Sequence, residues 1–251
     1  MVGFTSTELA ALLAAWWLPF CRVAALFSSA PVLSHRAFPV RMRLAAALVI
    51  SAAVAAGGGA PAPPQGSLMI LAAAEQVAIG LAMGFTMQLV FAGANLAGEL
   101  VGLQMGLGFG TLFDPAGGGQ TPAVGAFFSI TALLLFVGMD GHLVLIQAVA
   151  VSLRELPPGA LVSRLDPVRL AQAGEVVFRT GLSIALPALA GLLLVNIAFG
   201  LVARVSPQLN VFAVGFPATL FAGLALLALT VPAWVAAIAN AIGTMLATLG
   251  R

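Results

Sequence analysis

The chain has 251 residues, of which 61% are hydrophobic and 7% are charged, with ten Arg, eight acidic residues and no Lys. Soluble domains carry about 25% charged residues, so this composition cannot cover a water-facing surface and predicts an integral membrane protein. The net charge is only +2, and the Arg residues are too scattered to form the basic patch that nucleic-acid binding requires. We therefore expect no nucleic-acid partner.

Residues for catalysis or metal binding are scarce. Cys21 is the single cysteine, so no internal disulfide can form. His35 and His142 have no His, Cys or acidic partner at metal-ligand spacing. The sequence contains no Gly-x-Ser-x-Gly, no His-Glu-x-x-His and no Walker-type loop. We expect a protein that is not an enzyme, with no catalytic residue, no metal and no cofactor.

Apolar runs predict the helices. In chain order they cover residues 9–33, 44–56, 67–103, 123–153, 176–202 and 211–249. A spanning helix needs about 20 apolar residues, and an open sheet edge in lipid would leave backbone groups without hydrogen bonds. The sequence therefore predicts an all-α, polytopic membrane protein of about six apolar helical segments. We expect a single membrane-embedded domain over residues 1–251 and no soluble domain.

The distribution of Arg residues conflicts with simple up-and-down topology. The positive-inside rule places the Arg residues of 36–43 and those of 154–169 in the cytoplasm. Three apolar runs separate the two groups, and an odd number of crossings puts them on opposite faces. Either acidic residues weaken the second signal, or one long run is a re-entrant hairpin, broken at residues 106–122 or 140–142. We therefore expect the segments to be arranged as helical hairpins.

The third apolar run carries a stripe of small and polar residues. At about 100° per residue, the stripe occupies an arc of roughly one quarter of the helix. Its predicted helix-packing residues are Gly80, Gly84, Gly98 and Gly102, and Gly106 continues the small-xxx-small spacing that lets membrane helices approach closely. Glu99 lies on the same arc, and a carboxylate in an apolar run usually faces protein or a water-filled path. We predict that Glu99 is paired within the protein, with amide donors from Gln88 and Asn95.

Three Arg residues lie inside apolar runs or at their ends. For Arg204 we expect the guanidinium to extend to the membrane interface. Arg22 and Arg179 lie deeper in their runs. For these two, the sequence leaves open whether they extend to the interface or pair with Glu75, Glu99 or an acid on another subunit.

Residues 106–122 interrupt the apolar pattern with many Gly residues and an Asp-Pro pair. Most connections between elements are about 4–6 residues long, so seventeen residues are long for a simple turn. The sequence pattern alone nevertheless favours a plain connection between helices.

Short blocks of sequence with a recognisable pattern occur in both halves of the chain. The first half has Pro39-Val40-Arg41, Glu75, Gly80, Gly84, Gln88, Phe91, Ala97-Gly98-Glu99-Leu100, Gly102-Leu103-Gln104-Met105-Gly106 and Asp114-Pro115. The second half has Asp140-Gly141-His142, Asn196, Arg204, Pro207-Gln208-Leu209-Asn210-Val211-Phe212 and Gly215-Phe216-Pro217. With these blocks the chain resembles, over nearly its whole length, the FliR family of inner-membrane components of the bacterial flagellar type III export gate.

Two alternatives to the flagellar role remain. Injectisome members of the same family tend to have Asp-x-Gln-Arg-Gly where this chain has Gly102-Leu103-Gln104-Met105-Gly106. They also tend to have Ser-Met-Pro followed by Lys in place of Gly215-Phe216-Pro217. Both departures favour the flagellar branch. A small-molecule transporter or channel, the second alternative, would need a polar midplane site built by broken helices.

The resemblance implies a structural role in protein export. It implies that the chain joins FliP-type and FliQ-type subunits in a closed, helically wound assembly in the inner membrane, at the flagellum basal body. Unfolded flagellar substrates would pass through its centre, and an FlhB-type switch protein would set the substrate class. The resemblance also implies that residues 106–122 plug this pore at rest. The plug residues would be Gly106, Leu107, Phe109, Leu112, Phe113, Asp114, Pro115, Gly117, Gly118 and Gly119.

Overall fold

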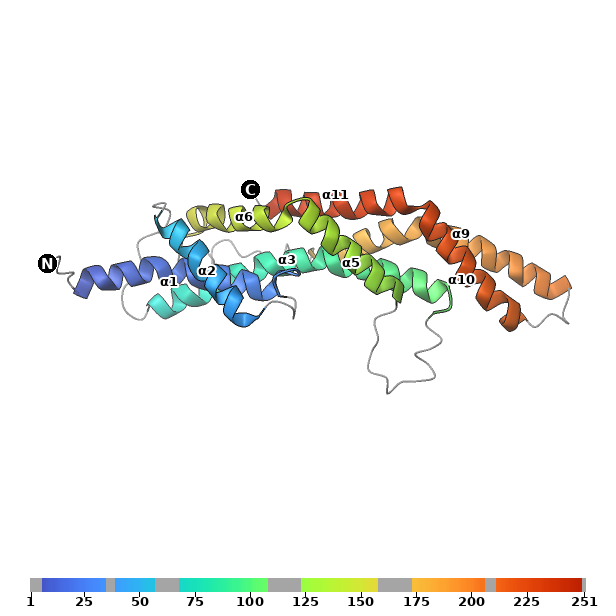
Figure 1. Cartoon of the computed structure of the whole chain (residues 1–251), viewed down its shortest axis with the longest axis horizontal. Coiled ribbons are helices and arrows are strands. Elements are labelled where there is room, and N and C mark those ends of the chain that lie inside the picture. Colours follow the sequence, from blue (N-terminus) through green and yellow to red (C-terminus); the bar gives the residue numbers. More distant parts are fainter. Residues whose placement is uncertain are drawn as a thin grey trace, which may run out of the picture. The chain divides into compact units, whose positions relative to one another are not determined.

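The computed structural model describes residues 6–34, 39–56, 68–107, 123–157, 173–205 and 211–249. Regular structure in these ranges is entirely helical (Figure 1). The helices are α1 (Ser6–Ser29), α2 (Val40–Ala56), α3 (Leu68–Gln104), α5 (Ala123–Gly138), α6 (Gly141–Glu155), α9 (Glu175–Val205), α10 (Val211–Leu229) and α11 (Val231–Leu249). The predicted all-α class is confirmed.

Three of the described helices are long and apolar enough to cross a membrane, namely α3, α9 and α11. The bent pair of α5 and α6 would make a fourth span if it is counted as one. This is fewer than the six or so segments that the sequence predicted. One reason is length, since α2 has 17 residues and the described apolar part of α10 covers only Val214–Leu229, short of the roughly 20 that a span needs.

The chain forms two compact units, and α3 contributes to both. The first unit consists of Met1–Gln88, Val137–Ala171 and Gly243–Arg251, and the second of Leu89–Phe136 and Gln172–Ile242. A single functional domain over residues 1–251 stays a prediction.

In the first unit, α1 packs against α2 and α6 (Figure 1). The side chains of Leu18, Val23 and Leu26 on α1 are almost completely buried. Arg22 on the same helix is also buried, and its contacts are described below with the candidate site.

In the second unit, the consecutive helices α9 and α10 pack against each other as a hairpin (Figure 1). Aromatic rings fill the space between α5 and α11. The rings of Phe128 and Trp234 meet edge to face, with centroids 5.0 Å apart and an interplanar angle of 84°, a favourable geometry for aromatic pairs. The indole N–H of Trp234 donates to the carbonyl oxygen of Leu227 at 3.1 Å, which links the start of α11 to the end of α10.

One residue accounts for the break between α5 and α6. Asp140 has a left-handed backbone with φ of 55°, a conformation that Asp tolerates better than most residues because its short polar side chain can bond locally. The carbonyl of Asp140 accepts hydrogen bonds from the N–H groups of Leu143 and Val144 at 2.9 and 3.1 Å, which start α6. The interruption predicted at residues 140–142 is therefore a bend between two helices.

Candidate functional site

The candidate site is built on α3, which carries most of the predicted packing and polar residues. The helix has 37 residues and no internal Pro, so at 1.5 Å per residue it extends about 55 Å. The hydrocarbon core of a bilayer is only about 30 Å thick. A helix of this length can support different neighbours along its two halves.

In the first unit, two glycines of α3 let α1 approach closely. A Cβ atom on Gly80 would meet the carbonyl oxygen of Arg22 and would lie 2.8 Å from the Cβ of Ala25. A Cβ on Gly84 would meet the hydroxyl of Ser29 and would lie 2.8 Å from the backbone nitrogen of Ala30. Ala25 and Ser29 are themselves small and four residues apart, so small residues face each other on both helices, as membrane helix interfaces favour.

In the second unit, the C-terminal half of α3 approaches α5 in the same way. A Cβ on Gly98 would meet the Cα of Gly125 and would lie 2.6 Å from its backbone nitrogen. Gly102 is buried one turn further along. The contact between Gly98 and Gly125 brings the two backbones together with no side chain between them.

A second glycine contact in this unit was missed by the sequence analysis. A Cβ on Gly93 would lie 2.9 Å from the Cβ of Thr180 on α9, and a Cβ on Gly181 would lie 3.1 Å from the carbonyl oxygen of Gly93. Gly93 lies off the stripe of small residues, although both Gly93 and Gly181 have an Ala four positions later, Ala97 and Ala185. This small-xxx-small spacing was the signal that could have identified both residues.

Gly106 ends α3. Its φ is 83°, and its N–H donates to the carbonyl of Leu103 at 3.0 Å. The N–H of Leu107 donates to the carbonyl of Gly102 at 2.9 Å. This pair of bonds is a Schellman motif, which requires a left-handed residue and so favours glycine. Gly106 thus acts here as a helix cap.

The predicted plug lies largely outside the described residues. Gly106 and Leu107 are described, and they lie at the end of α3. The other predicted plug residues, which are outside the described ranges, are Phe109, Leu112, Phe113, Asp114, Pro115, Gly117, Gly118 and Gly119.

Glu99 belongs to a short chain of polar side chains in the second unit. The amide nitrogen of Asn95, one turn earlier on α3, donates to Glu99 Oε1 at 2.7 Å. The hydroxyl of Ser129 on α5 lies 3.3 Å from the amide oxygen of Asn95, to which it donates. Asn95 is therefore the amide donor that the structure brings to Glu99. Gln88 instead donates to the carbonyl oxygen of Ser29 at 2.7 Å, in the first unit.

Arg22 is completely buried, with an exposed fraction of 0%. Its Nε donates to Gln76 Oε1 on α3 at 2.8 Å. One terminal nitrogen donates to the hydroxyl of Ser152 on α6 at 3.0 Å, and the other donates to the carbonyl oxygen of Leu156 at 2.7 Å. Leu156 caps the C-terminus of α6, where a positive charge is favoured by the helix dipole.

Gln76 is a partner of Arg22 that the sequence analysis did not identify. It is fully buried, and its amide nitrogen has no hydrogen-bond partner among the described residues. A polar residue next to Glu75 in an apolar run was a usable signal, because buried polar side chains need partners.

Arg179 and Arg204, the other two Arg residues singled out, are both exposed on α9. Arg204 lies in the last turn of this helix, where a cation is favoured. The structure therefore separates the three Arg residues into one that ties helices together inside the protein and two that lie at a surface.

The arrangement of these residues is suited to holding helices in contact. Among the described residues, no group of three or more His, Cys, Asp and Glu side chains could hold a metal ion. Close glycine contacts and short polar chains along α3 instead fix its neighbours at defined positions.

The chain is similar to known bacterial proteins over most of its length. The family of bacterial export proteins, family 1, matches residues 13–245. The flagellar biosynthetic protein FliR of Escherichia coli (strain K12) is 41% identical over 234 residues, which cover 92% of this chain and 90% of that protein. FliR of Pectobacterium carotovorum is 40% identical over 235 residues, with the same coverage. FliR of Bacillus subtilis is 29% identical over 209 residues, covering 81% and 80%. The chain therefore belongs to the FliR family of bacterial flagellar biosynthesis and export proteins.

Proposed function

We propose that the chain is a structural subunit of the flagellar type III protein export gate. With FliP-type and FliQ-type subunits it forms the pore through which unfolded flagellar proteins cross the inner membrane, and an FlhB-type protein acts as the substrate switch. The observation that carries this proposal is the 41% identity to a FliR protein over 92% of the chain. The matched region includes all of α3, since the family model alone covers residues 13–245.

The surface of the described helices supports an assembly with other subunits. Large apolar side chains are exposed along several of them, including Leu134 on α5, Leu194 on α9 and Phe221 on α10. Exposed apolar surface of this extent has to be covered by lipid or by neighbouring subunits. The proposal assigns part of it to the FliP-type and FliQ-type partners and part to the bilayer. The chain would work as one membrane-embedded unit over residues 1–251, in the inner membrane at the flagellum basal body.

Residues 106–122 are proposed to plug the pore at rest. Support comes from the two helix ends that flank this segment. The Schellman motif at Gly106 ends α3 sharply, and the contact between Gly98 and Gly125 holds α3 against the start of α5. A segment anchored at both ends can be displaced by a substrate and return to its place. Its side chains Leu107, Phe109, Leu112 and Phe113 would supply the apolar bulk that blocks water and ions.

Export assays distinguish the flagellar proposal from its two alternatives. In cells whose chromosomal gene for this protein has been deleted, expression of this chain should restore swimming. It should also restore secretion of hook and filament proteins. Restored secretion of injectisome substrates without flagellar export would favour the injectisome alternative. Solute uptake by vesicles that contain this chain alone would favour a small-molecule transporter.

A further inference from the structure

Glu99 is the one charged residue from position 76 to position 113 of the sequence. It lies in the C-terminal half of α3, and its side chain is half-buried. A carboxylate in an apolar helix is costly unless protein or water faces it. The groups around Glu99 therefore indicate what this part of the second unit can contact.

The polar contacts of Glu99 are all directed toward its carboxylate. Ser129 on α5 donates its hydroxyl to the amide oxygen of Asn95, 3.3 Å away. The amide nitrogen of Asn95 in turn donates to Oε1 of Glu99 at 2.7 Å. This direction suits an ionised carboxyl group, which can only accept hydrogen bonds. The two neutral residues hold Glu99 in one orientation but supply no positive charge.

The second unit provides no cation for Glu99. Its basic residues are Arg179 and Arg204, with no Lys and no His, and both Arg side chains are exposed on α9. In the part of the chain that the structure describes, Glu99 has its hydrogen bond from Asn95 and forms no ion pair. Coulomb attraction is strong where the dielectric constant is low, so a cation brought by another molecule would bind here.

Glu99 shares its surface with apolar residues of α3 and α5. We use the name Glu99 face for the half-buried or exposed residues Asn95, Glu99 and Leu103 on α3 and Ala126, Ser129 and Leu133 on α5. On each helix these residues are three or four positions apart, so they share one side of it. Leu103 is 62% exposed. The Glu99 face thus combines one carboxylate with small and aliphatic side chains.

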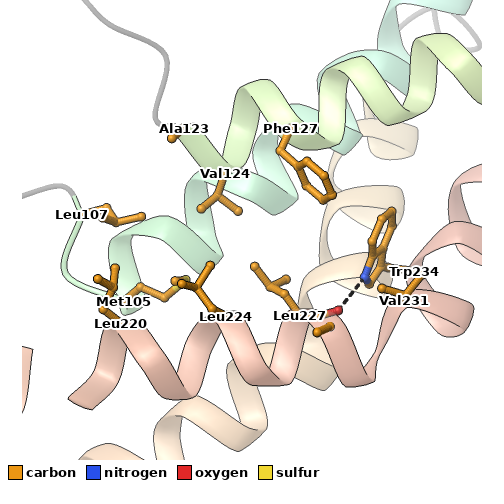
Figure 2. A pocket seen from close by; sticks show the side chains of 11 residues that line it. Met105, Leu107, Ala123, Val124, Phe127, Leu220, Leu224, Leu227, Val231 and Trp234 are labelled. Atoms are coloured by element: carbon orange, nitrogen blue, oxygen red, sulfur yellow. Dashed lines mark hydrogen bonds between the residues drawn. The ribbon is translucent and has the colours of Figure 1, made fainter. Parts of the chain in front are cut away.

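Helices α10 and α11 pack on a different side of α3 and α5. Met105 of α3 and Val124 of α5 are buried and lie on the side that faces Leu224 of α10 (Figure 2). The ring of Phe128 on α5 contacts Trp234 of α11. The second unit therefore covers this side with its own helices, and the Glu99 face lies apart from these contacts.

We propose that the Glu99 face binds an apolar helix of another subunit, and that an Arg or Lys side chain of that helix pairs with Glu99. Charge complementarity fixes the register of such a contact. The small residues Ala126 and Ser129 let a helix approach closely. Because Asn95 already orients the carboxylate, little freedom is lost when the ion pair forms. This inference rests on the assembly with other subunits that is proposed above.

The first test reverses the charge in cells that make the full chain with its natural partners. Glu99→Arg should lose most of the assembled complex on blue-native gels, because two cations would then face each other. The matched control is Glu175→Arg, which makes the same change at an exposed acid in the first turn of α9 and should leave the amount of complex unchanged.

Suppressors distinguish an ion pair from a general loss of folding. The genes of the FliP-type and FliQ-type subunits are mutagenised in Glu99→Arg cells, and cells that swim again are selected. We expect a change of one Arg or Lys to Glu or Asp in an apolar segment of a partner. Rescue by Arg179→Glu in this chain would place the cation within the chain and would overturn the proposal.

A photocrosslink gives a readout that does not depend on the folding of Glu99→Arg. Benzoylphenylalanine replaces Leu103, one turn beyond Glu99, in the otherwise unchanged chain. After irradiation, we expect a link to a partner peptide that has an Arg or Lys within about seven residues, which is two helical turns. Adding Glu99→Leu should lower the yield of this link.

A wild-type amount of complex with Glu99→Arg would overturn the proposed contact. A link from position 103 only to lipid, only to this chain, or to a partner peptide without a nearby basic residue would overturn it as well. In these cases the partners still co-purify with the wild-type chain, and the proposed function stands. If they do not co-purify with it, the proposed function fails too.

Discussion

Arg22 on α1 donates a hydrogen bond of 2.7 Å to the carbonyl oxygen of Leu156, the residue that caps the C-terminus of α6. The same guanidinium bonds to Gln76 on α3. One fully buried cation therefore joins three helices through oxygen atoms of neutral groups. A buried cation is costly unless its donors are satisfied, which makes this arrangement sensitive to small changes.

Replacing Arg22 should weaken the protein more than replacing an Arg at the surface. Arg22→Met removes the donors to Gln76 Oε1 and to the Leu156 carbonyl, and each buried group left unsatisfied costs about 1–3 kcal/mol. Arg22→Lys should give an intermediate loss, because an ammonium cannot reproduce the planar donor fork of a guanidinium. The measurement is size-exclusion chromatography of the purified assembly after heating, which gives the temperature at which the native peak is lost. The exposed Arg204→Met is the control.

A double variant separates the lost hydrogen bonds from lost packing at the same place. Adding Gln76→Leu to Arg22→Met removes the orphaned amide together with its partner, so part of the lost stability should return. Equal thermal stability of Arg22→Met, Arg204→Met and wild type would show that the buried cluster does not hold the three helices together.

The contact between the backbones of Gly98 on α3 and Gly125 on α5 predicts a position-specific effect of a single methyl group. Gly98→Ala would drive a Cβ into the backbone of Gly125, and overpacking of this kind costs about 1–3 kcal/mol. Gly200→Ala is the matched control, because a Cβ there meets nothing within 4 Å and alanine improves helix propensity by about 1 kcal/mol. Gly102→Leu should also disturb packing at this seam.

Blue-native gels of the assembled complex report these glycine effects. We expect less intact complex for Gly98→Ala and Gly102→Leu, and a wild-type amount for Gly200→Ala. If Gly98→Ala and Gly102→Leu both assemble as well as Gly200→Ala, this face of α3 is not a close-contact surface.

The hydrogen bond from Asn95 to Glu99 predicts how Glu99 variants will rank. Glu99→Gln keeps an oxygen that can accept from Asn95, whereas Glu99→Leu leaves the Asn95 amide without this acceptor. Asn95→Asp would place a second carboxylate next to the first and should be the most damaging of the three changes. Swimming in soft agar should therefore decrease from Glu99→Gln to Glu99→Leu to Asn95→Asp. Equal swimming of the first two would remove the basis for a paired Glu99.

Deletion of residues 112–119 tests the proposed plug. The flanking ends of α3 and α5 remain, so the complex should still assemble, but it should conduct ions at rest or make cells sensitive to small toxic solutes. Membrane conductance of cells that express the deletion is the measurement. A complex that assembles normally and stays as tight as wild type would show that this loop does not close the pore.

The sequence predicted the long helix accurately because its signal is local. An unbroken apolar run over residues 67–103 corresponds closely to α3, Leu68–Gln104, and the charge-poor composition left no alternative to a membrane class. The spacing of Gly80, Gly84 and Gly98 marked positions where another backbone comes close. The helical periodicity shows which residues share a face of the helix. It can be read from the sequence without knowing which other helices pack against that face.

Partner identities could not be read from the same pattern. Gly80 and Gly98 share an arc, yet one faces α1 and the other faces α5, because a helix of this length passes different neighbours. Gln88 and Asn95 also share the arc, but Gln88 bonds to α1 and Asn95 bonds to Glu99. The contact of Arg22 with Leu156 joins residues 134 positions apart, and no local signal encodes such a pairing.

Affinity purification of the tagged full chain from its native membrane, followed by native mass spectrometry, tests the central claim most directly. The account predicts one stable complex in which this chain is present together with FliP-type and FliQ-type subunits, and in which the Arg22→Met and Gly98→Ala variants are depleted. Recovery of this chain as a stable species without those subunits, from cells that export flagellar proteins normally, would contradict its assignment as a subunit of the export gate.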